Sequence, residues 1–168
     1  GLNRVLGFIV NLLRAIPFII LLMLMLPITR WILGTTLGST AVVVPLAACA
    51  APYVARMVES SLKEVDSGVI EAAKSMGAST IQIVLKVLLP EAKPSLLTSC
   101  AIAVTTILGY STMAGFTGGG GLGDIAVRYG IHRYNLEVMG VAVVIIIVIV
   151  QLIQYVGGGL SKKTDKRL

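Results

Sequence analysis

Residues 71–90, EAAKSMGASTIQIVLKVLLP, form a charged and helix-prone stretch that lies between hydrophobic runs long enough to cross a membrane. Just before it, Asp66 or Ser67 can cap a short helix, because either side-chain oxygen can accept a hydrogen bond from a free backbone amide. Gly77 can end that helix, since glycine adopts the left-handed conformation at little cost. The residues therefore predict a short helix that stops at Gly77.

A second helix is predicted to start directly after this stop. Ser79 and Gln82 have the spacing of a capping box, in which each side chain bonds the backbone amide of the other residue. The apolar run that follows continues to Pro90, where the proline ring removes a backbone donor. Two short helices joined at a glycine therefore form an elbow, and this elbow is the part of the chain that can contact a soluble partner.

The stretch resembles the EAA loop of the membrane-spanning subunits of ATP-binding-cassette importers. The family pattern is E-A-A, three residues, G, nine residues and I-x-L-P, and Val87 here replaces the usual isoleucine. In that family the elbow docks into a groove of the ATPase subunit and transmits its motion. The resemblance implies the same role for residues 59–90, the coupling segment, which would lie in the cytoplasm. Its predicted coupling residues are Glu71, Ala72, Ala73, Gly77, Ala78, Leu89 and Pro90.

Composition places the chain in a membrane. Of its 168 residues, 56% are hydrophobic and 13% are charged, with a mean hydropathy of +0.92, whereas about a quarter of the residues of a typical soluble domain are charged. Residues 32–55, 94–123 and 138–161 contain no Asp, Glu, Lys or Arg, and about 20 helical residues suffice to cross a bilayer. A shorter run between Arg14 and Arg30 can span only if it tilts little and Arg30 snorkels.

We therefore expect one all-α domain, residues 1–168, folded as a polytopic transmembrane helical bundle of the type I importer permease kind. The Pro- and Ala-rich second span should lie inside the bundle, because small side chains let helices approach closely, and the Val- and Ile-rich fourth span should face lipid. Importer permeases usually have one more amino-terminal span, so the resemblance implies that an upstream span is missing. The expected elements are an inner-surface helix at residues 2–13, a first span at 14–33 that Pro27 kinks or ends, and spans at 40–58, 92–114 and 138–156.

The basic residues indicate topology. They outnumber the acidic residues by 14 to 8 and are scattered at the ends of apolar runs, which is unlike a nucleic-acid-binding patch. With the coupling segment inside, eleven basic residues lie on the cytoplasmic side and only Arg30, Arg128 and Arg133 lie outside. We therefore predict a multi-pass protein of the bacterial inner membrane with both chain ends in the cytoplasm. Cys49 and Cys100 are interpreted as small packing residues.

A glycine cluster follows the third span. It contains a formal G-x-G-x-x-G match, but a dinucleotide site needs this loop between a strand and a helix, and a phosphate loop needs Lys followed by Ser or Thr where Asp124 stands. The cluster is predicted to be either an outer gate loop or a simple turn between two spans. The predicted gate residues are Gly115, Gly118, Gly119, Gly120, Gly121 and Gly123.

The sequence supports two other classes of function less well. An intramembrane serine hydrolase could use the hydroxyls at Tyr110 and Ser111 with His132, the only histidine, but His132 falls in a polar loop instead of a second span. A channel or exchanger that works alone commonly places ionisable residues within the membrane, and the three long spans have none near their middle. We predict no catalytic residues, metal ligands or cofactor on this chain.

Further segments resemble one branch of the importer family, the permease subunits of bacterial methionine importers. This resemblance implies transport of D- or L-methionine by alternating access. The implied partners are a second copy of the chain, two ATPase subunits that bind ATP and Mg, and a periplasmic or lipoprotein substrate-binding protein. The chain would be surrounded by lipid and would bind no nucleic acid. Another small amino acid remains an alternative cargo, and the substrate-binding residues are unknown. The segments are residues 14–20, 26–30, 44–46, 51–59, 109–111 and 118–129, followed by Tyr134 and Met139.

Overall fold

The computed structural model describes residues 2–164, and every regular element in that range is helical. The predicted all-α class is therefore confirmed. Gly1 and the basic tail at residues 165–168, which the topology prediction also concerns, lie outside the described residues. The elements are α1 (Leu2–Ala15), α2 (Phe18–Leu33), α3 (Ser39–Lys63), α4 (Ser67–Ser75), α5 (Thr80–Ile83), the π-helix η1 (Val84–Leu88), α6 (Leu89–Ser111), the 3-10 helix η2 (Thr112–Thr117), α7 (Leu122–Val127), the π-helix η3 (Arg128–His132) and α8 (Leu136–Thr164).

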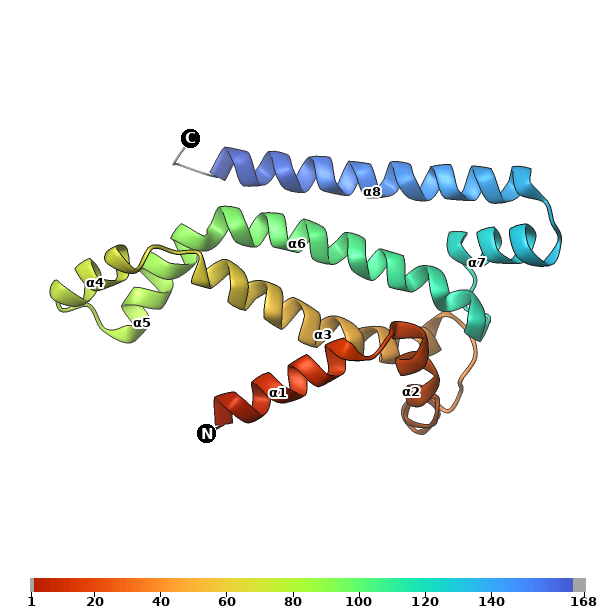
Figure 1. The fold of residues 1–168 in the computed structure, drawn as a ribbon, viewed down its shortest axis with the longest axis horizontal. Coiled ribbons are helices and arrows are strands. Elements are labelled where there is room, and N and C mark those ends of the chain that lie inside the picture. Colours follow the sequence, from red (N-terminus) through yellow and green to blue (C-terminus); the bar gives the residue numbers. More distant parts are fainter. Residues whose placement is uncertain (1, 165–168) are drawn as a thin grey trace.

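Three long apolar helices form the body of the molecule. They are α3, the continuous helical stretch Thr80–Thr117 that contains α6, and α8, and each is long and apolar enough to cross a membrane. Figure 1 shows α8 along one edge beside α6, and α3 on the other side of α6. The short helices α4 and α5 project at one end, called here the coupling end, while η2 and α7 lie at the opposite end, called the far end (Figure 1).

The second and fourth predicted spans take the positions expected of them. α3 contacts α1, α2 and α6, and it buries Pro45 and Pro52 together with Cys49. α8 contacts α6, α7 and η3, and most of its Val and Ile side chains remain exposed. Small residues set the distance between α8 and α6, since a Cβ added at Gly157 would overlap the methyl group of Ala101. The interior α3 and the edge helix α8 are thus confirmed.

The change of direction expected between the helix at residues 2–13 and the first span is present, since α1 and α2 meet at an angle of 108°. The position of α1 at the membrane surface stays a prediction. Pro17 explains the break, because a proline disfavours the helical conformation of the residue before it. A groove between α1 and the coupling-end half of α3 shows that α1 belongs to the bundle. Its lining residues are Leu6, Gly7, Val10, Ala55, Arg56 and Glu59.

α2 is short and packs against the far-end half of α3 (Figure 1). Its 16 residues reach only about 24 Å, so α1 and α2 span a membrane only as a bent pair. Pro27 does not end the helix, which runs on to Leu33 and stops at Gly34 with φ +75°. The ring of Phe18 stacks on Tyr110 of α6 with centroids 5.2 Å apart. The buried cluster at this crossing contains Phe18, Leu21, Leu22 and Cys49, with Ile16, Met25, Leu46 and Tyr110 packed against it.

Candidate functional site: the coupling segment and the far-end junction

The stop of α4 has the geometry that the sequence predicts. Gly77 lies in the left-handed region with φ +77°. Its amide donates to the carbonyl oxygen of Lys74 at 2.9 Å, and the amide of Ala78 donates to the carbonyl oxygen of Ala73 at 3.1 Å. These two bonds define a Schellman motif, which satisfies carbonyls that the end of a helix would otherwise leave free. The predicted left-handed residue is therefore confirmed.

The helix starts on either side of this stop are capped by side chains. Asp66 caps α4, because its carboxylate accepts a hydrogen bond from the amide of Gly68 at 2.7 Å. Ser79 and Gln82 form the predicted capping box of α5, with the Ser79 amide donating to the Gln82 side chain at 2.8 Å. Both predictions are confirmed, and Asp66 is the one of the two candidate caps that acts.

The helix that starts at Ser79 does not end at Pro90. It passes through a π-helical turn, in which the Leu89 amide donates to the carbonyl oxygen of Val84, and continues as α6. Pro90 then occupies the first turn of α6, where a missing amide hydrogen costs little. The wider π turn accommodates the proline inside a continuous helix. Its amides bond carbonyls five residues earlier instead of four, which changes the hydrogen-bond pattern just before Pro90. In the elbow, which is made of α4 and α5, the second helix therefore continues through η1 into α6 without a break.

The predicted coupling residues line the projecting end of the molecule. Ala73 is buried against the rest of the elbow, whereas Glu71, Ala72 and Gly77 are exposed, Ala78 is half-buried, and Leu89 and Pro90 are exposed at the base. Large apolar side chains accompany them: Met76 is 82% exposed and Ile81 is 71% exposed. Large exposed apolar side chains on a projecting element are compatible with a surface that a protein partner covers.

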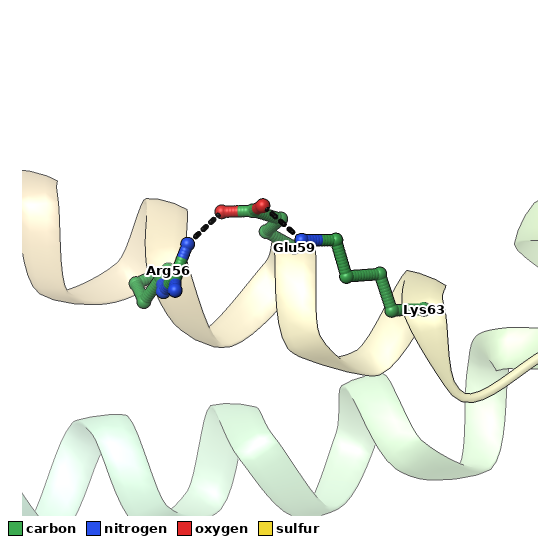
Figure 2. A network of polar contacts seen from close by, with 3 residues as sticks. All are labelled: Arg56, Glu59 and Lys63. Atoms are coloured by element: carbon green, nitrogen blue, oxygen red, sulfur yellow. Dashed lines mark hydrogen bonds and ion pairs between the residues drawn. The ribbon is translucent and has the colours of Figure 1, made fainter. Parts of the chain in front are cut away.

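A charged network marks the point where α3 leaves the bundle toward the elbow. Figure 2 shows Glu59 between Arg56 and Lys63 on one face of the helix, with nitrogen-to-oxygen distances of 2.7 and 2.6 Å. The three residues are three and four positions apart, which places them on one side of a helix. All three side chains are substantially exposed, so water screens these pairs and they contribute little to the stability of the helix.

The glycines at the far end divide into two kinds. Gly118, Gly120 and Gly121 have φ values of +68°, +69° and +95° and form the turn between η2 and α7. Gly115 and Gly123 have ordinary backbone angles, but an added Cβ would lie 2.6 Å from the Asp124 carboxylate at Gly115 and would overlap the backbone of Thr112 at Gly123. Gly119 is also tight, because its Cβ would lie 3.0 Å from the Ala114 carbonyl oxygen. We call residues 112–124 the far-end junction.

An ion pair connects this junction to η3. The guanidinium of Arg128 donates to the buried Asp124 carboxylate at 2.6 Å. Both line a cavity of about 170 Å³ with Thr112 and His132. Ser111 lies outside this cavity and donates its hydroxyl to the Leu108 carbonyl oxygen at 2.7 Å, within its own helix. No hydrogen bond joins Ser111 to His132 among the described residues, so the geometry does not assemble a serine hydrolase there.

Sequence reasoning missed the hydroxyl contacts that join the spans. Hydroxyl groups of the third span bond partly to their own helix, as at Thr105 and Thr106. They also reach neighbouring helices, and this could not be foreseen because it depends on which helix faces meet. The interhelical pairs are Tyr53 with Thr106 at 3.2 Å, Ser61 with Ser99 at 2.8 Å, Glu64 with Ser95 at 2.5 Å and Thr98 with Ser161 at 2.9 Å. Across residues 2–164 no group of three or more His, Cys, Asp or Glu side chains could hold a metal ion.

An α-helical bundle with a projecting elbow defines a class of membrane transport component. A family profile described as "Binding-protein-dependent transport system inner membrane component" matches residues 2–168. The chain belongs to this family, and the membership predicted from the coupling segment is confirmed.

Individual relatives and a solved structure agree with this assignment. The probable D-methionine transport system permease protein MetI of Vibrio cholerae is 52% identical over 166 residues, which cover 99% of this chain and 74% of that protein. The methionine import system permease protein MetP of Bacillus subtilis is 44% identical over 167 residues, 99% of this chain and 75% of that protein. A chain of the MetNI methionine ABC transporter in an inward-facing conformation superposes with a TM-score of 0.93 at 48% identity, covering 98% of this chain and 76% of that one.

Proposed function

We propose that this chain is the permease subunit of an ATP-driven importer for methionine. The observation that carries the proposal is the elbow, in which a Schellman stop at Gly77 and a capping box at Ser79 hold two short helices out from the end of the bundle. Exposed apolar side chains on that elbow give an ATPase subunit a surface to bind. The cargo is proposed from the relatives, which are named as methionine permeases.

The proposed assembly contains a second copy of this chain, two ATPase subunits that bind ATP and Mg at the coupling end, and a substrate-binding protein at the far end. The coupling end lies in the cytoplasm, as do both ends of the chain. ATP hydrolysis takes place on the partner subunits, and this chain converts their movement into alternating access. Binding of ATP can drive that change only because the two states bind it with different affinity.

Uptake of labelled methionine tests the cargo. Cells that express the complete transporter should accumulate the label, and a panel of unlabelled amino acids should compete only where they resemble methionine. Deletion of this subunit alone should abolish uptake. Uptake that survives the deletion would contradict the methionine assignment, and competition by another small amino acid stronger than by methionine would make that amino acid the cargo.

We further propose that the far-end junction forms part of the outer gate. Its supports are the tight packing of Gly115 and Gly123 between η2 and α7 and the hydrogen bond from the Gly38 amide to the Thr117 carbonyl oxygen at 3.0 Å, which ties the α2–α3 turn to η2. A cross-link across the two junctions of the dimer should stop transport. Transport that continues at the wild-type rate after complete cross-linking would contradict the gate assignment.

A further inference from the structure

Two hydrogen bonds join α3 to α6 where the elbow leaves the bundle. The hydroxyl oxygens of Ser61 and Ser99 lie 2.8 Å apart, and Ser61 is only 1% exposed. One turn closer to the elbow, the hydroxyl of Ser95 donates to the Glu64 carboxylate at 2.5 Å. Both bonds connect residues before the elbow with residues after it, so they close the chain into a ring from which α4 and α5 project.

The spacing of the four residues suits this role. Ser61 and Glu64 are three residues apart on α3 and its cap, and Ser95 and Ser99 are four residues apart on α6, so each pair lies on one helix face. The two faces are therefore aligned over a full helical turn. A single bond would act as a pivot between the helices, but two bonds a turn apart resist rotation as well as separation.

A cavity lies beside the Ser61–Ser99 and Ser95–Glu64 hydrogen bonds, so these bonds matter more than they would in a fully packed core. All four residues line a cavity of about 430 Å³ between the coupling-end parts of α3, α6 and α8. Apolar side chains therefore do not fill this region completely, although Val65 and Ala92 in its lining are buried. A third helix is attached at the same level, because Ser161 of α8 donates to the Pro94 carbonyl oxygen at 2.8 Å.

We propose that Ser61, Glu64, Ser95 and Ser99 form a clasp that makes the elbow and the spans α3 and α6 one rigid body during transport. This inference rests on the proposed function as an ATP-driven permease. In this proposal the four side chains are positioning residues, which act through the placement of α3 and α6. With the clasp closed, a displacement of the elbow by the ATPase moves both spans. With the clasp open, the same displacement spreads the ends of α3 and α6 apart at the cavity and is lost.

The experiment measures cargo imported per ATP hydrolysed by the complete transporter in proteoliposomes. Ser61→Ala and Ser95→Ala each remove one hydroxyl without adding bulk. Each should lower the transport-to-ATP ratio about threefold to tenfold, the factor that the net value of one such hydrogen bond places on an equilibrium. Association with the ATPase and the rate of ATP hydrolysis should stay near wild type, because the elbow surface is untouched.

Matched variants separate a coupling role from a general loss of stability. Ser60→Ala changes an exposed serine next to the clasp and should have no effect. Ser95→Thr keeps a hydroxyl and should restore the ratio. Ser61→Ala combined with Ser99→Ala should lose no more than either change alone, since both remove the same bond.

A wild-type ratio in both Ser61→Ala and Ser95→Ala would overturn the clasp. So would a fall in ratio that Ser95→Thr fails to restore, or a loss that is additive in the Ser61 and Ser99 double variant. If the wild-type complex imports a different amino acid, the methionine assignment fails, whereas the clasp is then tested by the same ratio measured with that amino acid.

Discussion

The elbow and the far-end junction both depend on glycine, but for opposite physical reasons. At the elbow, Gly77 has φ +77° and an added Cβ would meet nothing within 4 Å. At the junction, Gly123 has an ordinary φ, but an added Cβ would overlap the backbone of Thr112. Gly77 is therefore required for its conformation, and Gly123 for the space that it leaves.

This difference matches what each end is proposed to do. The elbow projects from the bundle, so its shape has to be held by its own local bonds while its surface stays free for the ATPase (Figure 1). The junction comprises η2 and the start of α7, which contact each other, so its shape is held by close contact between helices. The backbone conformation at Gly77 sets the direction of the elbow, whereas close packing at Gly123 keeps the helices of the junction together.

The largest effect is expected from Gly123→Ala. The methyl group would meet backbone atoms of Thr112, which cannot move aside as a flexible side chain can, so η2 and α7 must separate. Forcing one extra carbon into a packed site costs about 1 to 3 kcal/mol or more. The thermal midpoint of the purified protein should fall clearly.

Gly140→Ala is the control for this change, because its methyl group would meet nothing within 4 Å and alanine favours a helix. It should be neutral or slightly stabilising. Equal thermal midpoints for Gly123→Ala and wild type would show that the junction has room, and the contrast with the elbow would then be lost.

Gly77→Val should affect coupling instead of folding. A β-branched residue in the left-handed region costs on the order of 1 to 3 kcal/mol, which the elbow can avoid only by re-aiming α4 relative to α5. The spans are untouched, so membrane insertion should remain normal while co-purification of the ATPase and uptake are both lost. Glu71→Ala should weaken the same docking less, because it removes one exposed charge. Normal docking in Gly77→Val would refute the elbow as the coupling element, and loss of insertion would show that Gly77 serves folding.

The local structure of the elbow could be predicted from the sequence because its bonds join residues two to five positions apart. Asp66 with Gly68, Ser79 with Gln82, and the stop at Gly77 all follow from neighbours along the chain. The apolar runs likewise identify the three long helices, since length and hydropathy are properties of a single segment.

Features that depend on two distant segments could not be predicted in this way. The glycine cluster was visible in the sequence, but only the position of Thr112 shows that Gly123 provides space. The role of Gly121 in the turn follows from its φ of +95°. Pro17 marks the break between α1 and α2 in the sequence, but the angle of 108° between the two helices could not be read from the residues. The hydroxyl of Ser61 bonds Ser99 only because those two helix faces meet, whereas a hydroxyl in a membrane helix can equally bond its own backbone.

The smallest effect is expected from Gly77→Asn, and it tests the conformational half of the comparison most directly. Asparagine adds more bulk than alanine, yet it enters the left-handed region more readily than other residues with a Cβ. Because nothing lies within 4 Å of the added Cβ, bulk alone should not matter at this position. Co-purification of the ATPase with Gly77→Asn should therefore stay close to wild type and well above that with Gly77→Val. If asparagine and valine reduce docking equally, Gly77 is required because the ATPase approaches its backbone closely, and the elbow then resembles the junction in needing space.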